Sequence, residues 1–328
     1  MKNVAIMDTS IMSFNLGDQI IMESARKGLK SVIKDDFVVN MPTHSPLFHR
    51  YEFSIRKNDS FKNSLNQIDY KFVCGTNLLE KNMSKRKNSW NMNILDLRYI
   101  NDFILVGVGT DGLNKVQNRY TKKFYQKALN GDFYHSVRDE KTKKFLESIG
   151  IKAINTGCVT LWGFTPEYCN TIPTKKAASV IFTITDYMQD IESDRYMINV
   201  LLSNYDSVYC WIQGINDLNY LESLNISGFN EKVQIIAPSL ESYSYFLSTN
   251  ECDYVGTRLH AGIKAMQMRK RAIIIGVDNR AKDINIDYNL NYIDRLEICH
   301  LDELINSEFT TKISIHQDRI KKFLGQFI

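Results

Sequence analysis

The sequence lacks most of the features that would assign it to a specialised class of protein. Only 5 of its 328 residues are proline, and its longest apolar runs, such as 272–277, are far too short to cross a membrane. The 41 Lys and Arg residues barely outnumber the 37 Asp and Glu residues, and they form no basic block of the kind found in nucleic-acid-binding chains. We therefore expect a protein without a membrane span and without a nucleic-acid partner.

Cysteine-based and nucleotide-based motifs are also missing. The six cysteines are scattered, with no Cys-x-x-Cys pair and no Cys/His cluster of zinc-like spacing. Neither a GxGxxG dinucleotide fingerprint nor a Walker loop occurs, and Met1-Lys2-Asn3 does not resemble a secretory leader. These absences predict reduced, mostly buried thiols in a cytoplasmic protein that uses no metal and no cofactor.

What the sequence does contain is an alternation of short apolar runs and amphipathic segments, which is typical of a parallel α/β sheet. The alternation pauses at residues 170–176, which include Pro173 and indicate a linker, and then begins again. We expect residues 1–170 and 171–312 to form two Rossmann-like domains that face each other across a cleft. In such sheets ligands gather beyond the carboxyl ends of the strands.

The pattern predicts strands and helices at specific positions. Expected strands cover residues 4–7, 37–40, 70–74, 103–106, 135–137 and 153–155, and then 179–183, 207–212, 233–236, 254–256 and 272–275. Expected helices cover residues 17–31, 121–129, 140–148, 192–203, 218–224, 239–248 and 259–268. Residues 313–328 form a basic amphipathic segment. We expect it to be a helix that packs back on the body, with a peripheral membrane contact as the alternative.

The stretch GTRLHAGIKAM, residues 256–266, places two polar side chains where a strand gives way to a helix. Thr257 is the expected N-cap, and the first turn of the helix would offer free N–H groups and a positive dipole end. If the chain is still extended here, Arg258 and His260 point the same way while Leu259 points into the core. Such a site could bind an anion and move a proton. The alternative is a structural Arg ion pair beside a hydrogen-bonded His.

Two further strand ends carry charged or small residues. In SVRDEKT, residues 136–142, Arg138 ends a strand, and Asp139 either caps the next helix or holds the arginine. In GVGTDG, residues 107–112, Gly109 belongs to a glycine-rich strand exit that we interpret as a ligand loop. For Arg138 the alternative is an ordinary surface arginine beside a capping Asp.

A third motif lies at the first long helix. In FNLGDQII, residues 14–21, Gly17 lets a ligand come close to the backbone. Asp18 is either a first-turn carboxylate favoured by the helix dipole or a group that binds or deprotonates a hydroxyl.

Together these motifs resemble the polysaccharide pyruvyl transferase family. The matching elements span residues 4 to about 283 and are Asn15-x-Gly17-Asp18, Ser136 to Thr142, Arg258-Leu259-His260, and the loop Asp278 to Lys282 after an apolar strand. The sequence departs from the family at two places. It has only Gly75-Thr76-Asn77 where many members have a longer glycine run, and Cys158-Val159 where an Asp-Pro or Cys-Pro pair is common.

The resemblance implies a glycosyltransferase-B-like, two-domain transferase that moves the pyruvyl group of phosphoenolpyruvate onto a sugar, commonly as a cyclic ketal. Its first domain would serve the acceptor and its second the donor. Arg138 and Arg258 would bind the donor's anionic groups, with help from the backbone of Leu259, and His260 would be the general acid or base.

Other residues receive their roles from the same resemblance. Asp18 would act at the acceptor hydroxyl, with Asn15, Gly17 and Gly109 also in the substrate site. Lys282 would meet the phosphate or remain solvated.

The sequence does not identify the acceptor. It would be a sugar or a lipid-linked oligosaccharide of a surface polysaccharide, and a lipid-linked acceptor would place the enzyme at the inner face of the membrane. Residues 44–66 and 80–101 carry aromatic side chains that could stack on sugar rings or be half-buried: Phe48, Tyr51, Phe53, Trp90 and Tyr99, with His44 and His49 beside them.

Two other functions compete with pyruvyl transfer. One is a glycosyltransferase that uses a nucleotide sugar, and the other is a catalytically silent glycan-binding protein.

Overall fold

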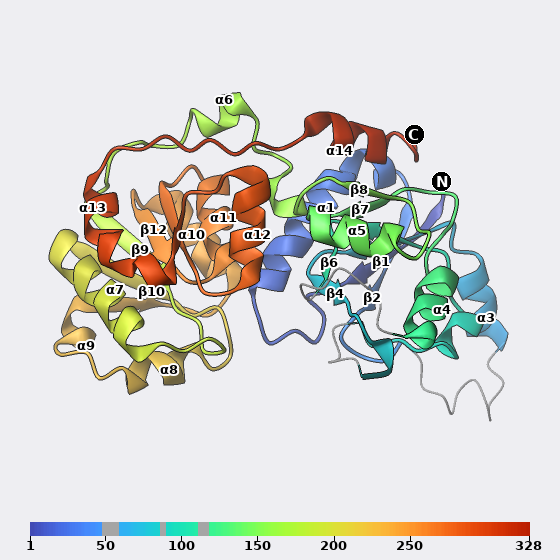
Figure 1. Cartoon of the computed structure of the whole chain (residues 1–328), viewed down its shortest axis with the longest axis horizontal. Coiled ribbons are helices and arrows are strands. Elements are labelled where there is room, and N and C mark those ends of the chain that lie inside the picture. The colour runs from blue at the N-terminus through green and yellow to red at the C-terminus, as the bar shows by residue number, and fades with distance from the viewer. Residues whose placement is uncertain (48–58, 86–89, 111–117) are drawn as a thin grey trace. The chain divides into compact units, whose positions relative to one another are not determined.

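The computed structural model describes residues 1–47, 59–85, 90–110 and 118–328 (Figure 1). The chain divides into two compact units. The first comprises residues 1–13, 21–162 and 316–328, and the second comprises residues 14–20 and 163–315. Both units are α/β structures built on parallel sheets, as the alternation of apolar and amphipathic segments indicates. The expected boundary between the two domains lay after residue 170. In the structure the second unit begins at Gly163 and also includes a short segment near the start of the chain.

The first unit contains a four-stranded parallel sheet with strand order β2-β1-β3-β5. Two parallel strand pairs accompany it, β4 with β6 and β7 with β8. The strands are β1 (Asn3–Asp8), β2 (Phe37–Pro42), β3 (Tyr70–Cys74), β4 (Asn77–Leu79), β5 (Phe103–Val106), β6 (Gly109–Thr110), β7 (His135–Val137) and β8 (Ala153–Asn155). The helices are α1 (Gly17–Ile33, whose first turn groups with the second unit), α3 (Asp59–Asn66), α4 (Arg119–Ala128), α5 (Glu140–Glu147) and α14 (Gln317–Leu324). Short 3-10 turns lie at Met83–Lys85, Asp96–Arg98 and Val159–Leu161.

Aromatic side chains fill the core of this unit. Trp90 is fully buried and meets Phe103 and Phe124 edge-to-face, with ring centroids 5.5 and 5.7 Å apart. A role for Trp90 in stacking on an acceptor sugar is therefore wrong, because its ring is enclosed by the core. Tyr99 is partly buried against the same core. Phe48, His49, Tyr51 and Phe53 lie outside the described residues.

The C-terminal segment packs on this same unit. Phe327 lies edge-to-face against Phe72 and Tyr70, at centroid distances of 5.1 and 5.4 Å. Phe323 is also buried. The Gln326 side chain accepts a hydrogen bond from the backbone N–H of Tyr134 at 2.7 Å. The helix proper covers only 317–324, which is shorter than expected.

The second unit contains a six-stranded parallel sheet with strand order β11-β10-β9-β12-β13-β14. The strands are β9 (Ser179–Thr183), β10 (Ser207–Trp211), β11 (Val233–Ile236), β12 (Asp253–Gly256), β13 (Ala272–Gly276) and β14 (Tyr292–Asp294). The helices are α6 (Pro166–Cys169), α7 (Ile191–Asn204), α8 (Asp217–Ser223), α9 (Phe229–Lys232), α10 (Leu240–Thr249), α11 (Leu259–Gln267), α12 (Asn279–Tyr288) and α13 (Leu301–Asn306), with a 3-10 segment at Arg295–His300.

This strand order is that of a doubly wound Rossmann sheet. The first strand of the series, β9, lies between β10, which follows it, and β12, to which the chain returns from the far edge. The direction of winding therefore reverses between β9 and β12. In sheets of this kind a crevice for ligands opens beyond the carboxyl ends of the two strands at the reversal. Arg258 follows β12 at that point.

Candidate functional site

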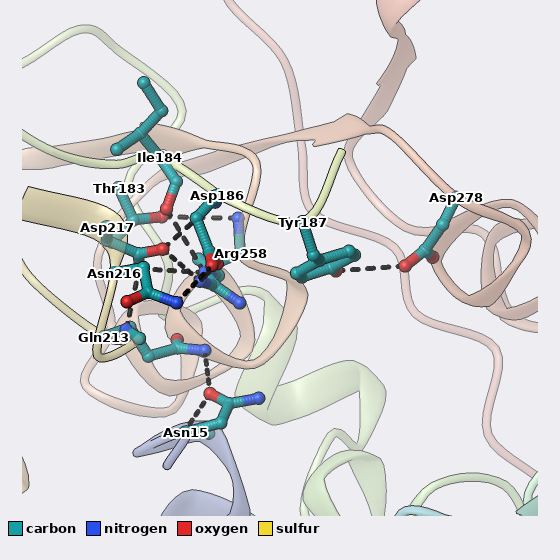
Figure 2. Close-up of polar contacts among 12 residues, drawn as sticks. Asn15, Thr183, Ile184, Asp186, Tyr187, Gln213, Asn216, Asp217, Arg258 and Asp278 are labelled. Carbon is teal, nitrogen blue, oxygen red and sulfur yellow. Dashed lines mark hydrogen bonds and ion pairs between the residues drawn. The ribbon is translucent and has the colours of Figure 1, made fainter. Parts of the chain in front are cut away.

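Arg258 is the centre of a buried polar cluster at the switch point of the second unit (Figure 2). Its side chain is 4 % exposed. Its Nε donates to Asp217 Oδ2 at 3.1 Å and to the Ile184 carbonyl at 3.2 Å. Its Nη2 donates to Asp186 Oδ1 at 3.0 Å and also to Asp217 Oδ1. In the described part of the chain no group accepts a hydrogen bond from Nη1, so the donors of this nitrogen are not used by the described residues.

Asp217 is buried beneath the guanidinium at the start of α8. It accepts hydrogen bonds from the backbone N–H of Gly214 at 2.7 Å and of Asp186 at 3.2 Å, in addition to those of Arg258. Burial raises the pKa of the Asp217 carboxyl, while the charge and hydrogen bonds of Arg258 act in the opposite direction. The pair therefore fixes the arginine in one orientation. The structural ion pair that the sequence offered as an alternative is therefore present, and it involves the Nε and Nη2 side of the guanidinium.

Gly214 is the residue that allows this approach. A Cβ at this position would lie 2.3 Å from Arg258 Nη2 and 3.0 Å from Asp217 Oδ1. Any larger residue would push the guanidinium or the carboxylate out of place.

The start of α11 differs from the expectation in one respect. The N-cap is Arg258, with φ −94° and ψ 103°, and its side chain does not cap the helix. The expected cap, Thr257, is wrong because its backbone N–H continues the sheet and donates to the Thr183 carbonyl at 3.2 Å. His260 is therefore in the first helical turn, not in an extended segment with Arg258, and it is buried. Both residues remain at the helix N-terminus, where the helix dipole favours an anion.

Tyr187 connects Arg258 to a second arginine that follows β13. The Arg258 guanidinium carbon lies 5.1 Å from the centre of the Tyr187 ring, and that of Arg280 lies 5.2 Å from it. The Tyr187 hydroxyl donates to Asp278 Oδ2 at 3.0 Å and accepts from Arg280 Nη2. Sequence reasoning missed Tyr187, Asp186 and Asp217. The available signal was their position in the loops and the helix start that follow two predicted strands.

The N-terminal motif lies in the second unit as well, although the sequence places it in the first half of the chain. Asn15 Oδ1 accepts from the Gly17 backbone N–H at 3.0 Å and from Gln213 Nε2 at 2.7 Å. The Leu16 N–H donates to the Gln213 carbonyl at 3.0 Å. A Cβ at Gly17 would lie 2.9 Å from Gln213 Nε2. The glycine therefore lets the Gln213 side chain lie close to the backbone of residue 17.

Asp18 is buried in the first turn of α1, where the helix dipole favours a carboxylate. The negative charge of Asp18 acts on Arg280. Burial alone would lower the pKa of Arg280. The interactions with Tyr187, Asp278 and Asp18 are stronger than this effect, and the pKa of Arg280 is raised.

Arg138 and Gly109 form a separate cluster in the first unit. Arg138 Nε donates to Asp139 Oδ2 at 3.1 Å, and Asp139 caps α5 by accepting from the Thr142 N–H at 2.7 Å. Asp139 thus both caps the helix and holds the arginine. Arg138 is 4 % exposed, so the alternative of a surface arginine is wrong. Gly109 lies directly beneath the side chain, because a Cβ there would be 2.3 Å from Arg138 Nε.

Lys282 lines a cavity of about 420 Å³ at the carboxyl ends of β13 and β14. Its side chain is 57 % exposed, and Nζ lies 3.9 Å from Asp294 Oδ2. The cavity is also lined by Met188, Gln189, Asp190, Gly276, Val277, Asp278, Asn279, Tyr292, Arg295 and Leu296.

Two further features bear on the sequence-based expectations. Five of the six cysteines are buried, Cys299 being exposed, and all six are free thiols. Within the described ranges, no three or more His, Cys, Asp or Glu side chains are grouped to hold a metal ion, and no helix has both the length and the apolar character needed to cross a membrane.

Comparison with known families identifies the chain. The model of the family described as polysaccharide pyruvyl transferase matches residues 15–279, most of the sequence. The chain belongs to the polysaccharide pyruvyl transferase family. The matched region contains the Asn15-x-Gly17-Asp18 motif, the Arg138 segment and the Arg258-Leu259-His260 segment. This protein is therefore an enzyme, a transferase of polysaccharide biosynthesis.

Solved structures similar to this pyruvyl transferase bear on its fold alone. UDP-GlcNAc 2-epimerase from Methanocaldococcus jannaschii, determined with UDP-GlcNAc and UDP, is 12 % identical, with 99 % of both chains covered and a TM-score of 0.54. The MnaA–UDP structure from S. aureus is 10 % identical, with 100 % of this chain and 98 % of that chain covered and a TM-score of 0.55. The fold is thus the glycosyltransferase-B-like arrangement of two Rossmann-like units. No curated protein matches the sequence.

Proposed function

We propose that this transferase moves the pyruvyl group of phosphoenolpyruvate onto the hydroxyl groups of a sugar, in a surface polysaccharide or its lipid-linked precursor. The product is a ketal. The observation that carries the proposal is the Arg258 guanidinium at the N-terminus of α11, fixed by Asp217 on one side and with Nη1 unused by the described residues. Phosphate and carboxylate groups both suit a guanidinium beside a helix N-terminus.

The two sides of the guanidinium have different tasks. Nε and Nη2 are taken up by carboxylates, so a donor oxygen would bind Nη1 together with the backbone N–H group of Leu259. Asp186 is 21 % exposed and is the partner that an incoming anion can displace, whereas Asp217 is buried and stays. In this proposal Arg138 binds the other anionic group of the donor, and Lys282 meets the phosphate.

The reaction balances without an oxidant or reductant. One acceptor hydroxyl adds to C2 of phosphoenolpyruvate while the methylene carbon takes a proton and becomes a methyl group. The C2–oxygen bond to phosphate then breaks, and a second hydroxyl of the sugar closes the ketal. Of the two hydroxyl protons, one is accounted for by the methyl group and the other leaves with phosphate. His260, in the first turn of α11, is the group proposed to move the proton, and Asp18 is proposed to act at the acceptor hydroxyl.

No metal or cofactor takes part in the proposed reaction, which we place in the cytoplasm. For lipid-linked acceptors it would occur at the inner face of the membrane. The apolar face of α14 contributes Ile320 and Phe323 to the first unit, so we do not assign the membrane contact to this helix.

The proposal is tested by thermal-shift titration with phosphoenolpyruvate beside a panel of nucleotide sugars, because a ligand of the folded state raises the melting temperature. We expect phosphoenolpyruvate to raise it and Arg258→Ala to abolish the shift. Release of inorganic phosphate in the presence of sugar acceptors then measures transfer. A shift with nucleotide sugars alone would favour a glycosyltransferase and overturn the proposal.

A further inference from the structure

Gln213 carries a buried carbonyl oxygen with no partner at the switch point. The residue follows β10 and is 4 % exposed. Within the described ranges, Gln213 Oε1 has no hydrogen-bond partner. Burying a carbonyl oxygen without a hydrogen-bond donor is unfavourable, so a buried acceptor of this kind indicates a missing donor.

The orientation of this amide follows from the backbone. The Gly17 N–H can only donate, so the atom of Asn15 that it meets at 3.0 Å is the oxygen. The same oxygen faces the Gln213 side chain at 2.7 Å, so the atom of Gln213 on that side must be the nitrogen, Nε2. Oε1 is therefore the free end. Figure 2 shows the Gln213 amide turned toward Asn15, below the Arg258 cluster.

A second buried group without a partner lies two strands away. Thr257, directly before Arg258, is 4 % exposed, and no described residue is hydrogen-bonded to its Oγ1. Gln213 and Thr257 follow β10 and β12, the two strands that flank β9 at the switch point. Gln213 is also joined to the Arg258 cluster through its neighbour, because the Gly214 N–H donates to Asp217.

We infer that Gln213 Oε1 and Thr257 Oγ1 form a hydroxyl-binding subsite that receives the acceptor sugar. The inference rests on the proposed function. Gln213 Oε1 can only accept a hydrogen bond, and the oxygens of a fully ionised phosphoenolpyruvate can only accept as well, so the two repel each other. A sugar hydroxyl donates and accepts, and it fits both side chains. The subsite is therefore specific for the acceptor, beside an arginine that serves the donor.

Asn15 acquires a different role in this scheme. It does not touch the sugar but is a positioning residue, because it holds the Gln213 nitrogen and so turns the oxygen toward the ligand. An aspartate at this position would still accept from both the Gly17 N–H and the Gln213 nitrogen, whereas a leucine would accept from neither.

The experiment compares Gln213→Met and Thr257→Val with wild type. Both variants remove the free polar atom at nearly constant volume, and Gln213→Met also removes the Nε2 donor to Asn15. We expect Thr257→Val to keep or raise the melting temperature, because its hydroxyl has no partner to lose. Thr183→Val is the matched control and should lower it, since Thr183 Oγ1 is hydrogen-bonded to the Tyr254 hydroxyl at 2.6 Å and to the Arg258 N–H at 3.3 Å.

Ligand binding is then measured with phosphoenolpyruvate and, in its presence, with the methyl glycosides of glucose, galactose and mannose, by saturation-transfer NMR. We expect Gln213→Met to weaken glycoside binding roughly tenfold or more, the size expected for one lost buried hydrogen bond. The thermal shift by phosphoenolpyruvate should be unchanged. Asn15→Leu should weaken glycoside binding in the same direction, and Asn15→Asp should restore it.

The outcomes separate this inference from the proposed function. If wild type shows no shift with phosphoenolpyruvate, the proposed function fails. If it shifts but binds none of the three glycosides, the sugar subsite does not exist. If Gln213→Met or Thr257→Val binds glycosides as wild type does, or loses phosphoenolpyruvate and glycosides equally, the assignment to the acceptor is overturned.

Discussion

The guanidinium of Arg258 and the carboxylate of Asp217 form a buried pair in which Nε lies 3.1 Å from Oδ2 while Nη2 donates to Oδ1. This two-pronged contact orients the arginine before any ligand arrives. It also means that the arginine brings little net positive charge to the site. The attraction for an anion must come from the free Nη1 donors and from the start of α11.

Removal of Asp217 should therefore destabilise the protein. Asp217→Ala leaves a buried guanidinium without its main partner, and we expect the free energy of unfolding to fall by about 3 kcal/mol in urea denaturation. The double variant Asp217→Ala with Arg258→Met removes both charges and should recover part of this loss. Arg258→Met alone completes the cycle, and a loss in the double variant equal to the sum of the two single losses would show that the two residues are not coupled.

Replacement of Asp186 should have the opposite effect on the ligand. Asp186 is the more accessible carboxylate partner of Arg258, at 3.0 Å from Nη2, and its negative charge competes with an incoming anion. We expect Asp186→Asn to tighten the binding of phosphoenolpyruvate about fivefold, corresponding to about 1 kcal/mol for a partly solvated charge. Calorimetric titration measures it. Weaker binding by this variant would mean that Asp186 assists the donor.

Gly214 offers a test of geometry without a change of charge. In Gly214→Ala the new methyl group would lie 2.3 Å from Arg258 Nη2, so the guanidinium must move. We expect the thermal shift by phosphoenolpyruvate to disappear. Gly163→Ala is the matched control, because its Cβ would have no atom within 4 Å, and it should behave as wild type.

His135 should make stability depend on pH. Its Nδ1 accepts from the Leu105 N–H at 3.2 Å and its Nε2–H donates to the Asn130 carbonyl at 3.0 Å, which defines a neutral ring. Burial lowers the pKa of His135 from 6.5 to about 4. Between these two values the unfolded chain binds a proton that the folded protein does not, so stability is full above pH 6.5 and falls as the pH drops toward 4.

The size of this effect is about 3 kcal/mol, from 1.36 kcal/mol for each pKa unit. Urea denaturation at pH 7.5 and at pH 4.5 measures it, and His135→Gln should flatten this part of the pH profile. His300 is exposed and serves as control, since His300→Gln should keep the profile of wild type. A wild-type profile retained by His135→Gln would refute the assignment.

The C-terminal segment should contribute to the stability of the first unit. Phe327 lies against Tyr70 and Phe72 and is 6 % exposed. We expect Phe327→Ala to cost about 3 kcal/mol in urea denaturation, as other buried Phe-to-Ala changes do. Its neighbour Ile328 is exposed, and Ile328→Ala should change stability by less than about 0.5 kcal/mol. Similar losses in both variants would contradict the packing.

The sequence predicted the elements of the sheets well because buried parallel strands are short apolar runs bounded by polar residues. The expected strands at 70–74, 103–106, 179–183 and 233–236 have the same bounds in the structure. It did not predict β14, in which Ile293 is the one buried residue of three. At Thr257 the capping preference of threonine was outweighed by a sheet hydrogen bond to Thr183, which depends on the tertiary fold.

The site was predicted less completely. The sequence singled out Arg258 and His260 because cationic side chains are unusual at the end of an apolar strand. Asp217 and Gln213 were not, because an Asp in the first turn of a helix and a Gln after a strand are ordinary in sequence. Their importance comes from contacts over long distances in the chain, such as that of Gln213 with Asn15, 198 residues away. Periodicity and motif spacing carry no information on such pairs.

Because residues 14–20 group with the second unit, that unit is discontinuous in the chain. A fragment that contains only residues 163–315 would therefore leave the Gln213 amide without Asn15 and the Gln213 carbonyl without the Leu16 N–H. To produce this unit of the enzyme separately, the heptapeptide of residues 14–20 would have to be supplied as a separate peptide or fused to the fragment.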